Sequence, residues 1–130
     1  MTANLLLVDD EPDAIELFRQ SFRREIRQGA CSIQFAQSGD EALDLLAQCG
    51  LAERLLMLSD INMPGMSGLD LLREVKQRWP ELPVIMITAY GDAEKRRLAK
   101  DFGASDFITK PVDFTQLKAT LGSHMHGDGI

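Results

Sequence analysis

The sequence predicts an α/β fold in which a parallel five-stranded sheet is covered by helices on both faces. Short apolar runs alternate five times with longer stretches whose apolar residues recur every three or four positions. Several of the short runs are apolar at consecutive positions, which is typical of strands that are buried on both faces. Strands that alternate with helices in this order form parallel sheets with right-handed crossovers.

Each expected strand is followed by a stretch with the period of a helix, and several of these stretches carry end signals. Pro12 lies near the start of the first helix, where a missing N–H costs little. Ser38, with Glu41 three residues on, is suited to cap the second. Gly103 follows the fourth in the position of a helix-ending glycine. The strands are expected at residues 5–8, 32–36, 55–58, 84–87 and 107–109. The helices are expected around Ile15, Phe18, Phe22 and Ile26, around Ala42, Leu43 and Leu46, around Leu69, Leu72, Val75 and Trp79, around Ala93, Leu98, Ala99 and Phe102, and around Phe114, Leu117 and Leu121.

Length and composition bound the class of protein. We expect one domain over residues 4–121 of the 130, and a flexible tail at residues 122–130, which have no apolar period. At 45% apolar residues the chain can bury a core, and its net charge of −6 argues against nucleic acid as a direct partner. No apolar run approaches the roughly 18–20 residues of a membrane span, and no basic stretch precedes the first run. We therefore expect no membrane segment, no signal peptide and a cytoplasmic location.

Polar residues that can do chemistry follow four of the five expected strands. Asp9 and Asp10 come directly after the first strand, and Asp60 comes just after the third. Thr88 follows the fourth strand and Lys110 the fifth. Because parallel strands end at the same edge of a sheet, and ligands of open α/β sheets bind there, we expect these side chains to converge.

Three carboxylates at one place repel each other unless a cation lies between them. Oxygen ligands without nearby histidine or thiolate suit Mg²⁺ or Mn²⁺. A lysine and a threonine hydroxyl beside such an ion would suit an anionic phosphoryl group, and an aspartate there is a candidate nucleophile. Glu11 also follows the first strand, but it is better explained as an acidic residue that favours the start of a helix.

Four stretches at the strand ends resemble those of response-regulator receiver domains, the phosphoacceptors of two-component signalling. They are LLLVDDE, DINMPGMSG, ITAYGD and GASDFITKP, and the resemblance covers about residues 4–121. It implies the flavodoxin-like, doubly wound (βα)5 fold, with five parallel strands in the order 2-1-3-4-5. It also implies a chemotaxis-regulator-like layout, in which phosphorylation of one aspartate switches an output surface.

The resemblance assigns the acidic residues to separate roles. Asp60 matches the phosphorylated aspartate. Asp10 matches the carboxylate that binds the metal directly, and Asp9 matches the one that binds it through a metal-bound water. Asn62 matches the residue whose backbone carbonyl completes the site. The implied ion is Mg²⁺ or Mn²⁺.

The remaining matches surround the phosphoryl group. Thr88 matches the hydroxyl that closes on it, and the backbones of Ala89 and Asn62 match the positions that contact its oxygens. Lys110 matches the family's lysine. The resemblance also implies a cis peptide bond between Lys110 and Pro111, which would aim the lysine into the cleft.

Three features depart from the family pattern or are open to two interpretations. Phe107 stands where many receivers carry a tyrosine that switches rotamer, so it is either a switch coupled to Thr88 or permanent core. Tyr90 either gates water from the phosphoryl group or is an exposed loop aromatic. The basic run at residues 95–97 is expected to be a solvated helix face.

The function implied is that of a signalling phosphoacceptor, which catalyses only its own phosphorylation and dephosphorylation and is not otherwise an enzyme. A sensor histidine kinase or a phosphotransfer protein would supply the phosphoryl group. A downstream effector protein or a fused output domain would respond, with no direct nucleic acid or membrane partner. The kinase, the output and the oligomeric state are not specified by the sequence.

Three other classes of protein fit the sequence less well. A Mg²⁺-dependent phosphatase with an aspartyl nucleophile needs a second aspartate two residues on, where this chain has Asn62. A flavin-binding module needs a phosphate loop after the first strand, where Asp9 and Asp10 would repel the phosphate. An interaction domain that has lost phosphorylation is disfavoured because the acidic, threonine and lysine positions are all filled.

Overall fold

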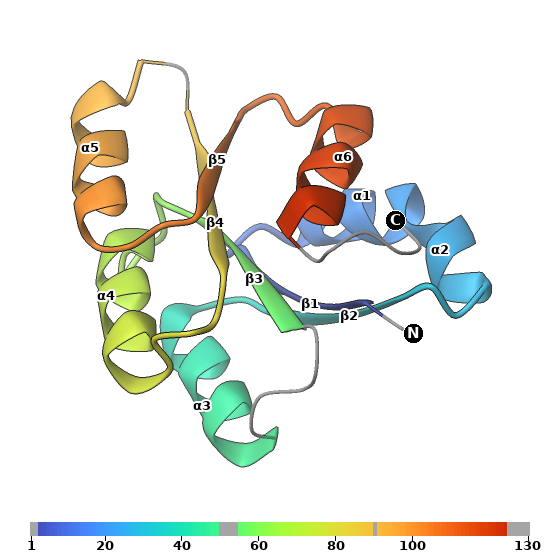
Figure 1. Cartoon of the computed structure of the whole chain (residues 1–130), viewed down its shortest axis with the longest axis horizontal. Helices are drawn as coiled ribbons and strands as arrows, with labels where there is room; N and C mark the ends of the chain where they lie inside the picture. Colours follow the sequence, from blue (N-terminus) through green and yellow to red (C-terminus); the bar gives the residue numbers. More distant parts are fainter. Residues whose placement is uncertain (1–2, 50–54, 90, 125–130) are drawn as a thin grey trace.

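The computed structural model describes residues 3–49, 55–89 and 91–124 and contains one five-stranded sheet between two layers of helices (Figure 1). All adjacent strands pair in parallel, in the order β2-β1-β3-β4-β5, so the predicted flavodoxin-like class and strand order are confirmed. The elements are β1 (Ala3–Val8), α1 (Pro12–Ser21), α2 (Arg23–Arg27), β2 (Cys31–Ala36), α3 (Gly39–Cys49), β3 (Leu55–Asp60), α4 (Gly68–Arg78), β4 (Val84–Thr88), α5 (Ala93–Asp101), β5 (Asp106–Thr109) and α6 (Phe114–His124).

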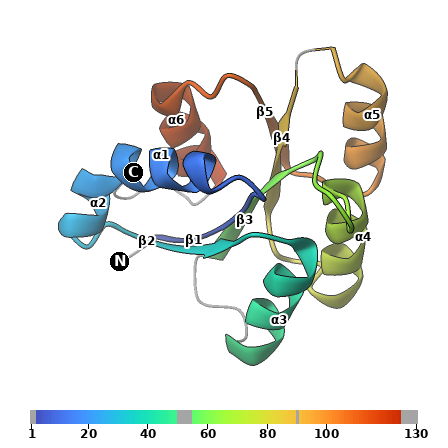
Figure 2. The ribbon, with the colours of Figure 1, turned by 180° about the vertical axis from the view of Figure 1, so that it is seen from behind.

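Successive residues of the central strands point into two separate cores. In β1, Leu5 and Leu7 pack with α1 and α6, whereas Leu6 and Val8 pack with α3, α4 and α5. All four are at most 1% exposed, because the strand is covered on both faces. Figure 2 shows α1 and α6 on one side of the sheet and α3, α4 and α5 on the other. This burial explains the consecutive apolar runs of the sequence.

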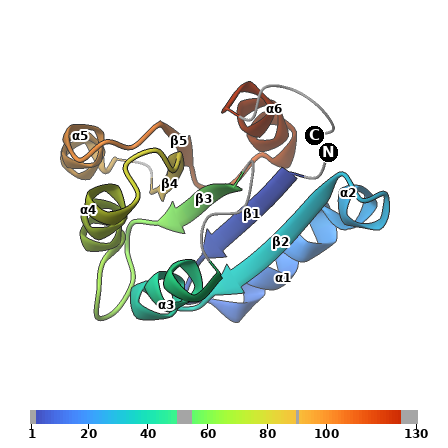
Figure 3. The ribbon, with the colours of Figure 1, turned by 60° about the horizontal axis from the view of Figure 1, so that its bottom comes forward.

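The strand register brings the polar strand ends to one edge of the sheet. Asp60 at the end of β3 lies opposite Ile87 of β4, and Thr88 lies opposite Thr109 of β5. Asp9, the first residue after β1, donates its backbone N–H to the carbonyl of Ala36 at the end of β2 (3.0 Å). Figure 3 shows the arrowheads of β1, β2 and β3 directed the same way. The sheet therefore fixes several functional residues relative to one another.

The first predicted helix is divided in the structure. The sequence predicts one apolar face from Ile15 to Ile26, but α1 and α2 are separated at Phe22, whose φ is −103°. Phe22 is fully buried, and its ring lies 6.4 Å from those of Phe18 and Phe114. Ile26 is 38% exposed. The core therefore follows the periodic pattern only as far as Phe22, and the chain turns there to begin the short helix α2.

The last helix is longer than predicted. Asp113 caps α6, since its Oδ1 accepts the backbone N–H groups of Thr115 (3.0 Å) and Gln116 (3.2 Å). The helix then continues through His124, whose Nε2 lies 3.0 Å from Oδ2 of Asp106. Residues 122–124, which the sequence assigns to a flexible tail, thus belong to α6, and His124 contacts β5. Residues 125–130 lie outside the described residues.

The helix-end signals named from the sequence are confirmed. Pro12 is the first residue of α1, and Ser38 Oγ accepts the N–H of Glu41 (3.1 Å) before α3. Gly103 follows α5 with a φ of 103°, a conformation that side-chain-bearing residues rarely adopt. Within the described ranges, no helix is both long and apolar enough to cross a bilayer.

Candidate functional site

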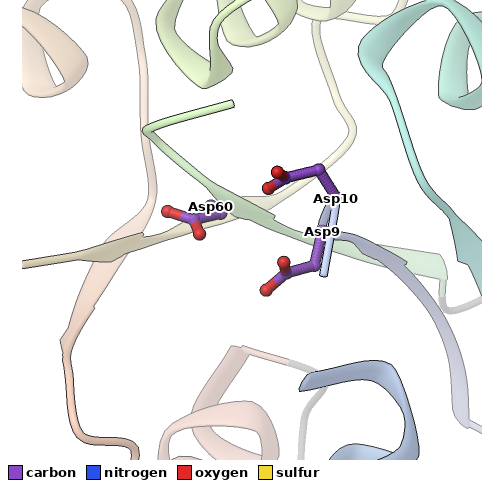
Figure 4. Close-up of side chains that lie close together, drawn as sticks. All are labelled: Asp9, Asp10 and Asp60. Atoms are coloured by element: carbon purple, nitrogen blue, oxygen red, sulfur yellow. The ribbon is translucent and has the colours of Figure 1, made fainter. Parts of the chain in front are cut away.

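Three carboxylates gather where β1 and β3 end. Asp9 and Asp60 are 2% and 3% exposed, and Asp10 is half-buried. One carboxylate oxygen from each residue lies within 4.8 Å of the other two. Figure 4 shows all three carboxylates extending to the same side. The predicted convergence of these residues is therefore confirmed.

Electrostatics make this cluster unfavourable by itself. Burial raises the pKa of Asp9, and the charges of Asp60 and Asp10 add to the increase. The backbone N–H of Glu11, which donates to Asp9 Oδ1 (2.9 Å), and the charge of Lys110 oppose it without cancelling it. A divalent cation would relieve the repulsion, and an all-oxygen donor set fits Mg²⁺ or Mn²⁺.

Lys110 reaches the same place from the end of β5. Its Nζ lies 2.6 Å from Oδ2 of Asp60, and the Lys110–Pro111 peptide bond is cis, as predicted. Burial alone would lower the pKa of Lys110, but the hydrogen bond and charge of Asp60, with Asp9 and Glu11, raise it above its usual value. The lysine therefore remains a fixed positive charge beside the carboxylate.

Thr88 adds an unused hydroxyl. The residue ends β4 with no exposed surface, and its Oγ1 has no hydrogen-bond partner among the described residues. A buried hydroxyl without a partner is costly, so such a group is expected to have a use. An anionic oxygen bound beside Asp60 would be a suitable acceptor. The backbone carbonyl of Thr88 accepts the N–H of Lys110 (2.8 Å), which ties the two strand ends together.

The loop after β3 is held close to α4 by a glycine that the sequence did not mark as functional. A Cβ on Gly68 would stand 2.1 Å from the carbonyl oxygen of Asp60. The N–H of Gly68 donates to the carbonyl of Ile61 (2.7 Å). Asn62 donates its own N–H to Asp60 Oδ1 (3.2 Å). The glycine next to Ser67 was the available signal, since only a residue without a side chain allows this approach.

The remaining predicted residues lie toward α5. Ala89 follows β4 and is half-buried, and its carbonyl accepts the N–H of Asp92 (3.3 Å). Phe107 is half-buried against the core of α3, α4 and α5, with the guanidinium of Arg96 5.1 Å from its ring centroid. The predicted gate, Tyr90, lies outside the described residues.

Chemically, this edge can hold a divalent cation and a phosphoryl anion together. The carboxylates offer hard oxygen ligands, while Lys110 and the hydroxyl of Thr88 offer a positive charge and a donor to the anion. Asp60 lies between the metal ligands and the anion-binding groups, since it belongs to the acidic cluster and pairs with Lys110. It is therefore the carboxylate best placed to act as nucleophile.

Comparison with known sequences gives a consistent result. The family described as response regulator receiver domain matches residues 5–122. The response regulator protein PilR of Pseudomonas aeruginosa is 43% identical over 120 residues, 91% of this chain and 25% of PilR. A probable cyclic di-GMP phosphodiesterase of Vibrio cholerae is 35% identical over 123 residues, 93% of this chain and 26% of that protein. The chain thus spans about a quarter of the length of these relatives.

Comparison with solved structures agrees. The receiver domain of NtrX from Brucella abortus has a TM-score of 0.82 and 32% sequence identity, and the match covers 94% of this chain and 98% of that one. A response regulator receiver domain protein from Clostridium thermocellum has a TM-score of 0.84 at 27% identity, with 95% and 94% covered. Sequence and fold therefore lead to one and the same family.

Proposed function

Because the chain belongs to the family of response regulator receiver domains, the phosphoacceptor modules of two-component signalling, we propose that Asp60 is its phosphoacceptor. The observation that carries the proposal is the pairing of Asp60 with Lys110 at 2.6 Å inside the three-carboxylate cluster. A buried aspartate that faces both a cation site and a lysine can attack phosphorus while its surroundings neutralise the entering charge.

The proposed metal site uses residues of this cluster. Asp10 and Asp60 would hold Mg²⁺ or Mn²⁺ directly, together with the backbone carbonyl of Asn62, and Asp9 would bind it through a water. Such an ion, when bound, neutralises negative charge on the phosphoryl oxygens. The pKa of Asp9, raised by burial and by its acidic neighbours, supports a cation requirement here.

In the proposed reaction, a carboxylate oxygen of Asp60 attacks the phosphorus of a phosphohistidine on a kinase or phosphotransfer protein. The new P–O bond forms as the P–N bond breaks, and the imidazole of the donor leaves. Lys110, Thr88 and the backbone N–H of Ala89 would bind the transferred oxygens. Hydrolysis returns Asp60 to its unphosphorylated form: water attacks phosphorus, the Asp60 carboxylate leaves, and inorganic phosphate is released.

The proposed consequence is a change of surface near α5 and β5. Thr88 gains an acceptor for its buried hydroxyl when it moves toward the phosphoryl group, and the space it leaves would admit the ring of Phe107. A change at this face would be sensed by a downstream effector protein or a fused output domain. This chain covers only part of the length of its relatives, which is consistent with a fused output domain. We also propose that the module is cytoplasmic.

The test is phosphorylation by a small donor. The purified chain is incubated with Mg²⁺ and acetyl phosphate, which loses acetate on transfer, and its intact mass is measured. We expect one added phosphoryl group that hydroxylamine removes, as it does an acyl phosphate. Excess EDTA should prevent the addition.

Two matched variants make the test specific. Asp60→Asn keeps the size of the side chain and should take up nothing. Asp13→Asn alters an exposed aspartate at the start of α1 and should behave like the wild type. An adduct that persists in Asp60→Asn, or no adduct with any phosphodonor, would refute the proposal.

A further inference from the structure

The side chain of Asn62 is bound at both ends by α5. Its Oδ1 accepts a hydrogen bond from Lys95 Nζ (2.5 Å), and its Nδ2 donates to Asp92 Oδ2 (3.3 Å). The backbone N–H of the same residue donates to Asp60 Oδ1 (3.2 Å). Asn62 therefore connects the proposed phosphoacceptor, through its backbone, to the first turn of α5, through its side chain.

Asp92 stands at the N-cap of α5 but does not cap it. An N-cap aspartate normally accepts a backbone N–H from the second or third helical residue, here Glu94 or Lys95. In α5 the N-cap side chain makes no such bond, whereas Ser67 caps α4 by accepting the N–H of Asp70 (3.2 Å). The carboxylate of Asp92 is instead directed to Asn62. The start of α5 thus lacks a cap that one of its own residues could provide.

We propose that Asp92 and Lys95 form a clasp on Asn62, called here the α5 clasp, whose release lets Asp92 cap α5. In the unphosphorylated protein the clasp holds the loop after β3 against α5 and leaves the helix start uncapped. In the phosphorylated protein the clasp is open and the first turn of α5 is stabilised. Asp92 and Lys95 are thus positioning residues, and the inference rests on the proposed phosphorylation of Asp60.

Charge gives the reason for the release. Phosphorylation of Asp60 replaces a carboxylate of one negative charge with an acyl phosphate of roughly two, so it adds about one negative charge beside the N–H of Asn62. The added charge attracts the ammonium of Lys95 and repels the carboxylate of Asp92. Lys95 is therefore drawn toward Asp60 while Asp92 is pushed away from it. The side-chain amide of Asn62 cannot keep its hydrogen bonds to both residues.

The clasp also lies next to the surface that is proposed to change. The N–H of Arg96 donates to the carbonyl of Asp92 (3.0 Å), and the guanidinium of Arg96 covers the ring of Phe107. A tighter first turn of α5 would fix this arginine more firmly. The clasp thus offers a route from Asp60 to Phe107 that does not pass through Thr88.

The first experiment needs no phosphorylation. Amide hydrogen exchange of Glu94 and Lys95 is measured by NMR in the wild type and in Asn62→Ala. Removing the Asn62 side chain frees Asp92 to cap α5, so exchange at both amides should become about five-fold slower, the factor that corresponds to a typical N-cap. Amides of β1 and β3 should be unchanged, which verifies the fold. Unchanged or faster exchange at Glu94 and Lys95 would overturn the proposal.

Three further variants separate the clasp from a general effect of mutation. Asp92→Ala cannot cap, so Asn62→Ala should have no effect in that background. Lys95→Met, which frees one end of Asn62, should also slow exchange at Glu94, whereas Lys100→Met, an exposed lysine of the same helix, should not. If Asn62→Ala still slows amide exchange in the Asp92→Ala background, Asp92 is not the cap.

The final arm adds acetyl phosphate and Mg²⁺ to the wild type. Exchange at Glu94 and Lys95 should slow to the level of unphosphorylated Asn62→Ala. If the chain takes up phosphoryl group and these amides do not change, the release step is refuted. If the chain takes up none, the proposed function fails, while the exchange of Asn62→Ala still decides whether the clasp exists.

Discussion

Among the described residues, two lysine–carboxylate pairs have nearly the same length but very different surroundings. Lys110 lies 2.6 Å from Asp60 at the carboxyl edge of the sheet, and Lys118 of α6 lies 2.8 Å from Glu25 of α2. The first pair shares its site with Asp9 and Asp10. In the second, Lys118 also donates to the carbonyl of Ser21 (2.8 Å) and lies 5.1 Å from the centroid of the Phe22 ring.

The difference lies in the charge that remains after pairing. At the carboxyl edge, one lysine faces three carboxylates, so the site has an excess of negative charge even with its ion pair formed. At the α2–α6 junction, one carboxylate is matched by one lysine, and nearby Arg24 also favours the charged form of Glu25. The length of an ion pair therefore does not identify a functional site. The unbalanced charge around it does.

Replacing each lysine by methionine should produce the largest contrast in phosphorylation. Lys110→Met removes the charge that faces the transferred oxygens, so the rate of phosphoryl uptake should fall about 100-fold. Lys118→Met is remote from this edge and should leave the rate within about two-fold of the wild type, an allowance well inside 1 kcal/mol. Rates are measured by intact mass over time with acetyl phosphate and Mg²⁺. Equal losses in both variants would contradict the assignment of the two pairs.

Lys118→Met should affect the stability of the fold rather than phosphorylation. Lys118→Met leaves Glu25 without its partner, and Oε1 of this residue already lacks a hydrogen bond among the described atoms. We expect the free energy of unfolding to fall by about 2 kcal/mol, less than for a fully buried pair because both side chains keep some exposure. Urea denaturation measures it. The double variant Glu25→Gln/Lys118→Met should recover part of the loss, and no recovery would mean that packing dominates.

Much of the functional edge was predictable from the sequence because it depends on local patterns. The strands are marked by consecutive apolar residues, and Asp9, Asp10 and Asp60 come directly at their ends. Parallel pairing then brings the three together without any side-chain detail. Lys110 and Thr88 follow from the same rule.

The features that sequence reasoning missed depend on contacts between distant segments. Lys95 belongs to a basic run expected to be a solvated helix face, but it is half-buried and bonds Asn62, 33 residues away. His124 was assigned to the flexible tail, but it contacts Asp106. Phe22 continues the helical pattern, yet its burial coincides with the break between α1 and α2. In each case tertiary packing determines the local structure, and the periodicity of the sequence carries no information about that packing.

Removing one carboxylate from the cluster at the carboxyl edge should stabilise the fold. Asp9→Asn keeps an oxygen that can accept the N–H of Glu11 but lowers the repulsion with Asp60 and Asp10. In metal-free buffer we expect a gain of about 1 kcal/mol, which raises Tm by about 4 °C for a domain of this size. Thermal unfolding measures it, with Asp13→Asn as the exposed control. Adding Mg²⁺ should raise the Tm of the wild type more than that of Asp9→Asn, and a lower Tm in metal-free buffer would count against charge excess at this edge.

The smallest effect should be the acid dependence of the α2–α6 junction. Burial alone would raise the pKa of Glu25, but the hydrogen bond and charge of Lys118, with Arg24, leave it below its usual value of 4.5. A carboxyl whose pKa is lowered by folding stabilises the fold above its unfolded pKa, and this contribution is lost as pH falls through the folded pKa. Near pH 7 Glu25 is charged in both proteins, so the wild type and Lys118→Met should differ by the full contribution of the pair. As pH falls, the difference should begin to narrow through the variant, because burial without Lys118 raises the pKa of Glu25. Below pH 4.5 the difference should shrink, because protonation of Glu25 removes the pair from the wild type.

Urea midpoints across this pH range measure the difference in the free energy of unfolding. A difference that stays constant to low pH would mean that Lys118 stabilises the junction through Phe22 and Ser21 rather than through charge.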